Sequence, residues 1–256
     1  MRVEPFKCQR LQALSPECKR STACFWVFYL VIFMNIEKWK SMSGLEQTLF
    51  LESNHPINGR GMPRKPVHGV GFNDAYYCQQ PIIEGGRVAC PAYVDWKSMI
   101  ERAYGAKFHA KRPTYIGVTV CDEWHSFMSF RSWWLENQID GYHLDKDLLS
   151  GGRTYSPDAC IFIPLWLNNF TSDRRGGRGE WQIGASWHKA SGRFVACCHN
   201  PVTLKHGHIG LFDTPEAAHR AWLSRKLDLA LELKPKMDEI DLRIYPRVVE
   251  IVNGLR

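Results

Sequence analysis

The chain has 256 residues, a net charge of +7 and a pI of about 8.9. This length suffices to bury a sizeable core in one or two domains, and the positive charge modestly favours a polyanionic partner. The nine cysteines are odd in number and contain no C-x-x-C pair, which argues against a disulfide scaffold or a zinc finger and favours buried free thiols in a reducing compartment. A metal site formed by four of them is a minor alternative: Cys78, Cys90, Cys121 and Cys160.

Residues 1–66 are predicted to be a poorly ordered N-terminal extension and linker. The run Ala23–Met34 is apolar and follows Lys19 and Arg20, but its twelve residues are fewer than the roughly twenty that span a bilayer. No small-residue cleavage site follows promptly, as it would after a signal peptide. A packed or membrane-touching helix, and a start site chosen too early, are the alternatives. Gly59–Gly71 is rich in glycine, proline and basic residues, which indicates a linker or arm.

Two helices are predicted in the middle of the chain. Tyr93–Tyr104 has apolar residues at helical spacing and is expected to be amphipathic. A short strand at Ile116–Cys121 leads to Asp122, a good N-cap, and the second helix is expected over residues 123–138. We expect the aromatic stripe of this second helix to face the core: Trp124, Phe127, Phe130 or Arg131, and Trp134.

A β-hairpin followed by a short helix is predicted next. Tyr142–Leu149 alternates loosely as a strand, the Ser150-Gly151-Gly152 segment is a turn, and Asp158–Ile163 is a second strand. Pro164–Phe170 has the proline and the length of a short helix.

This layout resembles that of the His-Me finger, or HNH, nucleases, and the motif is similar to that of HNH-like bacteriophage proteins. The matching residues are Leu144-Asp145-Lys146-Asp147, Tyr155-Ser156-Pro157 and Cys160. The resemblance implies an endonuclease that hydrolyses a phosphodiester with Mg²⁺ or another divalent cation, held by oxygen ligands, while a base deprotonates water. It assigns Asp145 and either Asn168 or Asn169 to the metal, and Asp147, on the strand face of Asp145, is expected to supply a second oxygen ligand.

The base position of the resemblance holds Lys146 instead of histidine. A lysine amine is ordinarily protonated at neutral pH and accepts a proton only after strong desolvation. His143 lies two residues before Asp145, so the two share a strand face and His143 is expected to act as the base. The alternative is that Asp145, Lys146 and Asp147 form a structural ion-pair cluster in a nuclease-derived scaffold that does not cut DNA.

Three antiparallel strands with one helix laid across them are predicted between Trp181 and Lys226. The segments WQIGASW, GRFVACC and GHIGLF are rich in strand-forming residues and are separated by polar turns. Thr214 is a plausible N-cap, and Pro215 suits the first helical position. The helix is expected because five residues recur at helical spacing: Ala217, Ala218, Ala221, Trp222 and Arg225.

Alternation along the second strand separates a basic face from an apolar face. It places Arg193, Cys197 and His199 on one side and Phe194, Ala196 and Cys198 on the other. The region 171–210 holds six Lys and Arg residues against two acidic residues, which accounts for four of the seven net charges.

The layout resembles the APETALA-type, or ethylene-response-factor, DNA-binding domain, which also occurs in bacteriophage endonucleases. The matches are Gly184, the run Ile209–Thr214 and the helix start Glu216-Ala217-Ala218. The resemblance implies a sheet that lies in the major groove of duplex DNA. The residues that would face DNA or its phosphates are Ser186, His188, Lys189, Arg193, Cys197, His199, Lys205, His206 and His208. Several arginine positions of the plant domains hold serine or histidine here, so phosphate contact is expected more than base readout by arginine.

The remaining residues are predicted to be helical. The long helix should continue over Leu227–Leu233 as far as Pro235, and a helical tail with Ile240, Ile244, Val248 and Ile251 as its apolar stripe should be interrupted by Pro246. The tail should pack on the core or mediate self-association.

The whole chain is thus expected to be α+β, with an HNH-like domain over residues 67–173, a DNA-binding domain over 174–234 and a helical tail over 235–256. The resemblances imply a phage-type endonuclease, or alternatively a catalytically inactive DNA-binding protein or regulator. Double-stranded DNA is the expected partner, no membrane is expected, and the expected location is the cytoplasm, that of an infected host cell if the chain is phage-encoded.

Overall fold

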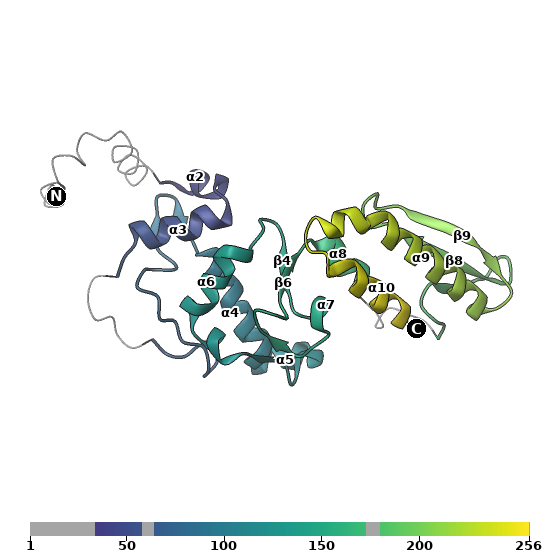
Figure 1. Ribbon diagram of the computed structural model, residues 1–256, viewed down its shortest axis with the longest axis horizontal. Helices are drawn as coiled ribbons and strands as arrows, with labels where there is room; N and C mark the ends of the chain where they lie inside the picture. Colours follow the sequence, from purple (N-terminus) through teal and green to yellow (C-terminus); the bar gives the residue numbers. More distant parts are fainter. Residues whose placement is uncertain (1–33, 58–63, 173–179, 256) are drawn as a thin grey trace, which may run out of the picture. The chain divides into compact units, whose positions relative to one another are not determined.

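The structure is a computed structural model that describes residues 34–57, 64–172 and 180–255. The chain divides into two units, residues 1–64 with 74–94 and residues 65–73 with 95–256. Its architecture is mixed α+β, as predicted, with the elements in the order that Figure 1 labels. Within the described ranges, no helix is both long enough and apolar enough to span a bilayer.

Two helices and a small hairpin lie in the first unit. They are α2 (Ile36–Ser41), α3 (Gly44–Asn54), β1 (Ile82–Ile83) and β2 (Gly86–Arg87). A capping box starts α3, because the Glu46 amide donates to Ser43 Oγ at 3.2 Å and the Ser43 amide donates to Glu46 Oε2 at 2.8 Å. The expectation of a poorly ordered extension is therefore wrong for residues 34–57. Residues 1–33 and 58–63 of that segment lie outside the described residues.

The central helices keep their predicted faces but not all of their predicted ends. They are α4 (Pro91–Tyr104), α5 (Ala106–Lys111), two 3₁₀ turns (Pro113–Tyr115 and Asp122–His125) and α6 (Phe127–Asn137). The aromatic stripe is buried, which confirms its prediction as core. The predicted cap Asp122 is wrong: Ser126 Oγ accepts the Ser129 amide at 3.1 Å, so α6 starts after Ser126.

Two short sheets follow. β4 (His143–Asp145) pairs antiparallel with β6 (Ile161–Ile163), and β3 (Thr119–Val120) pairs parallel with β5 (Thr154–Tyr155). The helices here are α7 (Asp147–Ser150) and α8 (Leu165–Thr171). The predicted strand over Tyr142–Leu149 is too long, because Asp145 Oδ1 accepts the amides of Asp147 at 2.9 Å and Leu148 at 2.7 Å and turns the chain into α7.

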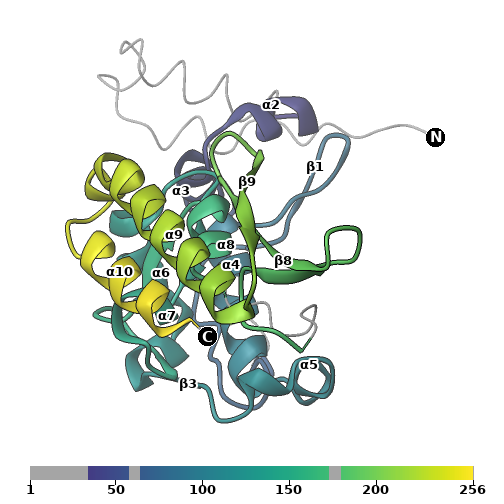
Figure 2. The same cartoon turned by 90° about the vertical axis from the view of Figure 1, so that its right-hand side faces the viewer.

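The predicted three-stranded sheet and its helix are confirmed. The strands β7 (Ala185–His188), β8 (Arg193–His199) and β9 (His206–Phe212) are ordered β7-β8-β9, and α9 (Pro215–Asp238) follows. Thr214 Oγ1 accepts the Ala217 amide at 3.2 Å and so caps α9. Figure 2 shows α9 lying along the sheet. Phe194, Ala196 and Cys198 of β8 are buried against it.

The close approach of sheet and helix depends on Gly184. Its φ is +83°, a conformation that glycine adopts without steric cost. A Cβ atom at this position would lie 2.0 Å from Trp222 Cγ on α9. The glycine that the sequence match singled out therefore leaves room for the Trp222 ring.

The C-terminal helix α10 (Ile244–Gly254) packs on the core, and both proline predictions there need correction. The long helix α9 runs past Pro235, because Leu233 and Met237 on either side of it are buried in the hydrophobic cluster. Pro246 does not interrupt α10 but lies in its first turn, where the missing N–H has no partner to lose.

One hydrophobic cluster of the second unit crosses the expected boundaries at residues 174 and 235. Its buried members come from six elements: Leu148 of α7; Ile163 of β6; Leu167 and Phe170 of α8; Phe194, Ala196 and Cys198 of β8; Trp222 and Leu229, among others, of α9; and Ile244, Val248 and Val252 of α10. The sheet and α9 therefore share their core with the hairpin and with α10.

Candidate nucleic-acid interface

The register of the sheet gathers the predicted DNA-facing residues on one face. Residues that pair directly across neighbouring strands point to the same side. His188 pairs with Arg193, Cys197 with His208, and His199 with His206. Since Phe194 and Ala196 face α9, these pairs occupy the opposite, outer face. All seven predicted strand residues there are exposed: Ser186, His188, Arg193, Cys197, His199, His206 and His208.

The outer face carries positive and titratable groups and no carboxylate on its strands, because no Asp or Glu occurs in β7, β8 or β9. Arg193 Nε donates to Asp213 Oδ1 at 2.9 Å, just after β9. The rings of His199 and His206 lie with their centroids 4.8 Å apart. Lys189 and Lys205 are exposed in the turns beside the strands, whereas Arg174, Arg175 and Arg178 lie outside the described residues.

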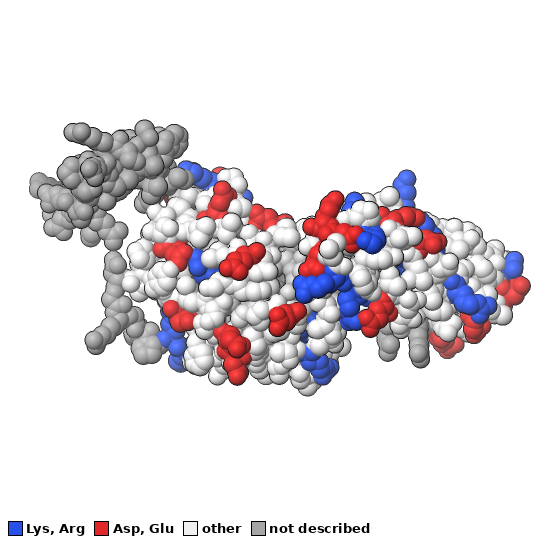
Figure 3. All heavy atoms as spheres, viewed as in Figure 1, with Lys and Arg blue, Asp and Glu red and all other residues white. Residues whose placement is uncertain are grey.

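The helical side of the same unit has a different charge pattern. Figure 3 shows acidic and basic side chains interspersed over α9 and α10. Ion pairs form there, such as Arg225 with Glu232 on α9 at 2.7 Å and Arg243 with Asp241 between the two helices at 2.6 Å. A polyanion is therefore expected to prefer the sheet face over the helical face.

In the hairpin cluster (residues 143–171), β4 pairs antiparallel with β6 and α8 follows β6 directly, but α7 and β5 lie between the two strands in place of the predicted turn. Asp145 lies at the end of β4, where its Oδ1 accepts two backbone amides. Burial raises the pKa of Asp145, and the two amide hydrogen bonds and Lys146 oppose this rise. The carboxylate that the resemblance assigned to metal thus accepts the first two amides of α7.

Lys146 is one of the buried charged residues, with only 7% of its side chain exposed. Its Nζ contacts the Asp147 carboxylate and donates to the Gly152 carbonyl at 3.4 Å. The ammonium lies 5.7 Å and 6.0 Å from the ring centroids of Tyr155 and Tyr115. An ammonium held by an ion pair and two aromatic rings is well suited to a structural role and has little access to a substrate.

Two of the four predicted metal ligands already bind groups of the protein: Asp145 accepts two backbone amides, and Asp147 contacts the Lys146 ammonium. No group of three or more His, Cys, Asp or Glu side chains converges on a metal position within the described ranges, and this includes the cysteines Cys78, Cys90, Cys121 and Cys160. His143 is exposed, and its electrostatic interaction with the Asp95 carboxyl on α4 lowers the pKa of that carboxyl. Asn169 lines a cavity with His199, His206 and Lys226 at the end of the sheet. Asn168 is partly buried on α8.

Two residues that the sequence interpretation did not select have notable surroundings. Burial raises the pKa of Asp95, which accepts a hydrogen bond from Trp134 Nε1 at 2.8 Å. Lys226 is half-buried on α9 and lines the cavity, whereas Arg225 was expected on the helical stripe. A signal for Lys226 was present in the sequence: it is a single basic residue at helical spacing between Trp222 and Ala230, both of which are buried.

Comparison with known proteins gives no relative. No family model, no curated protein and no solved structure matches this chain.

Proposed function

We propose that this protein binds double-stranded DNA through the outer face of β7-β8-β9. The observation that carries the proposal is the strand register, which collects Arg193, the exposed histidines and Ser186 on a face free of strand carboxylates. The major groove of B-DNA admits a β-ribbon, and basic side chains beside it neutralise phosphates. A DNA partner agrees with the expected cytoplasmic location.

The chemistry of the face favours phosphate positioning over base readout. Arg193 is the one arginine of β7, β8 and β9, and it is already oriented by Asp213. Imidazole and hydroxyl groups donate single hydrogen bonds, whereas arginine or asparagine can form the bidentate contacts that distinguish bases. Binding is therefore expected to depend on salt more strongly than on sequence.

Reversing the charge on the sheet face should weaken DNA binding. Arg193→Glu is expected to lower the affinity for a duplex by at least about tenfold at low salt, and to reduce the slope of log K against log salt by at least about one. Fluorescence anisotropy with a labelled duplex measures both quantities. Arg220→Glu on α9 changes the net charge equally but lies on the helix that covers the other side of the sheet, and should have little effect. Equal losses in the two variants would show that only the net charge matters.

A metal-dependent, phage-type endonuclease is the second candidate function, and the observation that favours it is the β4, β6, α8 order. If the protein cuts DNA, supercoiled plasmid should be nicked in Mg²⁺, and EDTA should abolish nicking. Asp145→Asn keeps an oxygen that can accept the amides of Asp147 and Leu148 but removes the carboxylate charge, so it should abolish nicking without loss of folding. Nicking that persists in Asp145→Asn would exclude Asp145 as a metal ligand, and its absence from the wild type would leave a binding protein.

A further inference from the structure

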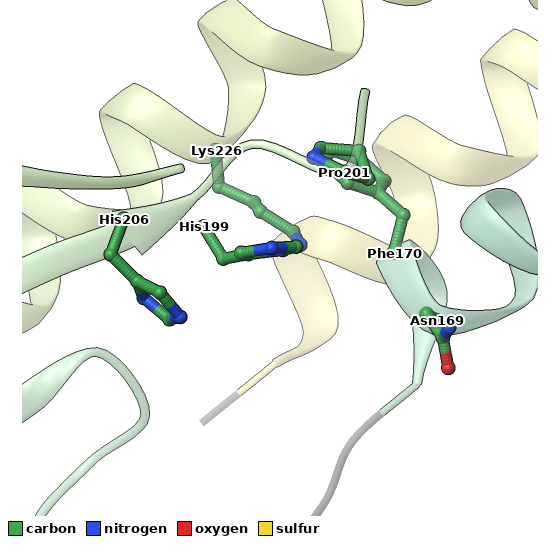
Figure 4. Close-up of a pocket in the computed structure, with 6 residues that line it drawn as sticks. All are labelled: Asn169, Phe170, His199, Pro201, His206 and Lys226. Carbon is green, nitrogen blue, oxygen red and sulfur yellow. The ribbon is translucent and has the colours of Figure 1, made fainter. Parts of the chain in front are cut away.

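A cavity of about 400 Å³ opens at one end of the sheet, between β8, β9, α8 and α9. Its lining residues are Asn169, Phe170, His199, Pro201, His206 and Lys226. Figure 4 shows the Lys226 and His199 side chains converging on the same part of the cavity, with His206 beside them and Phe170 and Asn169 on the α8 side. None of these lining residues is acidic, so the described lining offers only positive, titratable and neutral groups.

Lys226 is the central charge of this cavity. Its Nζ lies 3.6 Å from the centroid of the Phe170 ring, a cation–π contact that favours the charged amine. In the described part of the chain, no carboxylate pairs with Lys226. Burial lowers the pKa of Lys226 to about 8, so the amine still carries its proton at pH 7. The neighbouring Cys198 thiol stays neutral there, because burial raises its pKa.

The cavity is continuous with the proposed DNA-binding face. His199 and His206 pair across β8 and β9 on that face, and both also line the cavity. Lys226 reaches the same place from α9, which covers the opposite side of the sheet. An ammonium, two imidazoles and an amide are donors from which a phosphate oxygen accepts hydrogen bonds.

We propose that this cavity is a binding site for a phosphate group, held by Lys226 with His199, His206 and Asn169. The site rests on the proposed function when the phosphate belongs to DNA, but free phosphate would use the same donors. The experiment below separates these two sources.

The first arm uses the full-length protein and inorganic phosphate. Adding phosphate should shift the imidazole resonances of His199 and His206 in NMR spectra of the wild type. Lys226→Met replaces the ammonium with an apolar side chain of similar length that can keep the contact with Phe170. It should raise by about tenfold the phosphate concentration that gives half of the imidazole shift. Lys236→Met removes the same charge from an exposed position on the same helix and should leave the titration unchanged.

The second arm measures affinity for two duplexes that differ only in a 5′-phosphate or a 5′-hydroxyl end. A loss of about tenfold in Lys226→Met for both duplexes identifies a backbone phosphate, and a loss confined to the phosphorylated duplex identifies a terminal one. His206→Gln, at an exposed cavity position, should weaken the same interaction and guards against misfolding of Lys226→Met. Unchanged phosphate titration and unchanged DNA affinity in both variants would overturn the phosphate site.

The two proposals can fail separately. If Arg193→Glu weakens DNA binding while neither Lys226→Met nor His206→Gln affects phosphate or DNA, the sheet interface stands and the phosphate site is wrong. If the protein binds no DNA but inorganic phosphate shifts the two imidazoles in a Lys226-dependent way, the site stands with free phosphate as its ligand.

Discussion

Gly184→Ala is expected to lower the free energy of unfolding of the second unit by roughly 2–5 kcal/mol. About 1–2 kcal/mol comes from the left-handed backbone, where φ is +83°. Roughly 1–3 kcal/mol more comes from overpacking, since the new Cβ would lie 2.0 Å from Cγ and 2.4 Å from Cβ of Trp222. Urea denaturation followed by far-UV circular dichroism measures the change.

Gly192→Ala is the matched control for that substitution. Gly192 also has a positive φ, +62°, but nothing lies within 4 Å of a Cβ built there. It should lose only the backbone contribution of about 1–2 kcal/mol. If both variants lose the same stability, the Gly184–Trp222 contact does not limit how closely α9 approaches the sheet.

Leu229→Ala is expected to cost about 2–5 kcal/mol of stability, because it removes a leucine side chain from a packed core and leaves a cavity. Leu229 is 1% exposed and belongs to the cluster that joins the hairpin, the sheet, α9 and α10. Leu231→Ala, two residues further along the same helix, changes a side chain that is 60% exposed and should stay within about 0.5 kcal/mol of the wild type.

Thermal or urea unfolding measures the stability of the two leucine variants, and hydrogen exchange shows which elements lose protection together. Because the cluster includes Leu148, Ile163 and the buried residues of α10, Leu229→Ala should also lower protection from hydrogen exchange in α8 and α10. A loss of protection confined to the sheet and α9 would show that residues 174–234 are an independent domain.

Local patterns predicted the sheet and the start of its helix well. Alternation in β8 separated Phe194, Ala196 and Cys198 from Arg193, because a strand exposes successive side chains to opposite faces. Thr214 and Pro215 marked the start of α9, because capping depends on groups only a few residues apart. The aromatic stripe of α6 was assigned to the core for the same reason, since helical spacing fixes which side chains share a face.

The local patterns were less successful where a side chain competes with the backbone or where packing outweighs a helix breaker. Asp145 ended β4 early by accepting two amides, and Pro235 did not end α9 because the residues around it are buried. The sequence showed the charges of Lys146 and Asp147 but not the tyrosine rings that surround the ammonium, since Tyr115 comes from a distant part of the chain.

The sequence by itself therefore determined the α+β class, the three-stranded sheet and its basic outer face, because each depends on periodicity within a few residues. Only the tertiary structure decided that one core crosses the expected domain boundaries and that Lys226 lines a cavity with His199 and His206. These features bring together residues far apart in the chain. Periodicity tells which way a side chain points, but not which distant surface it meets.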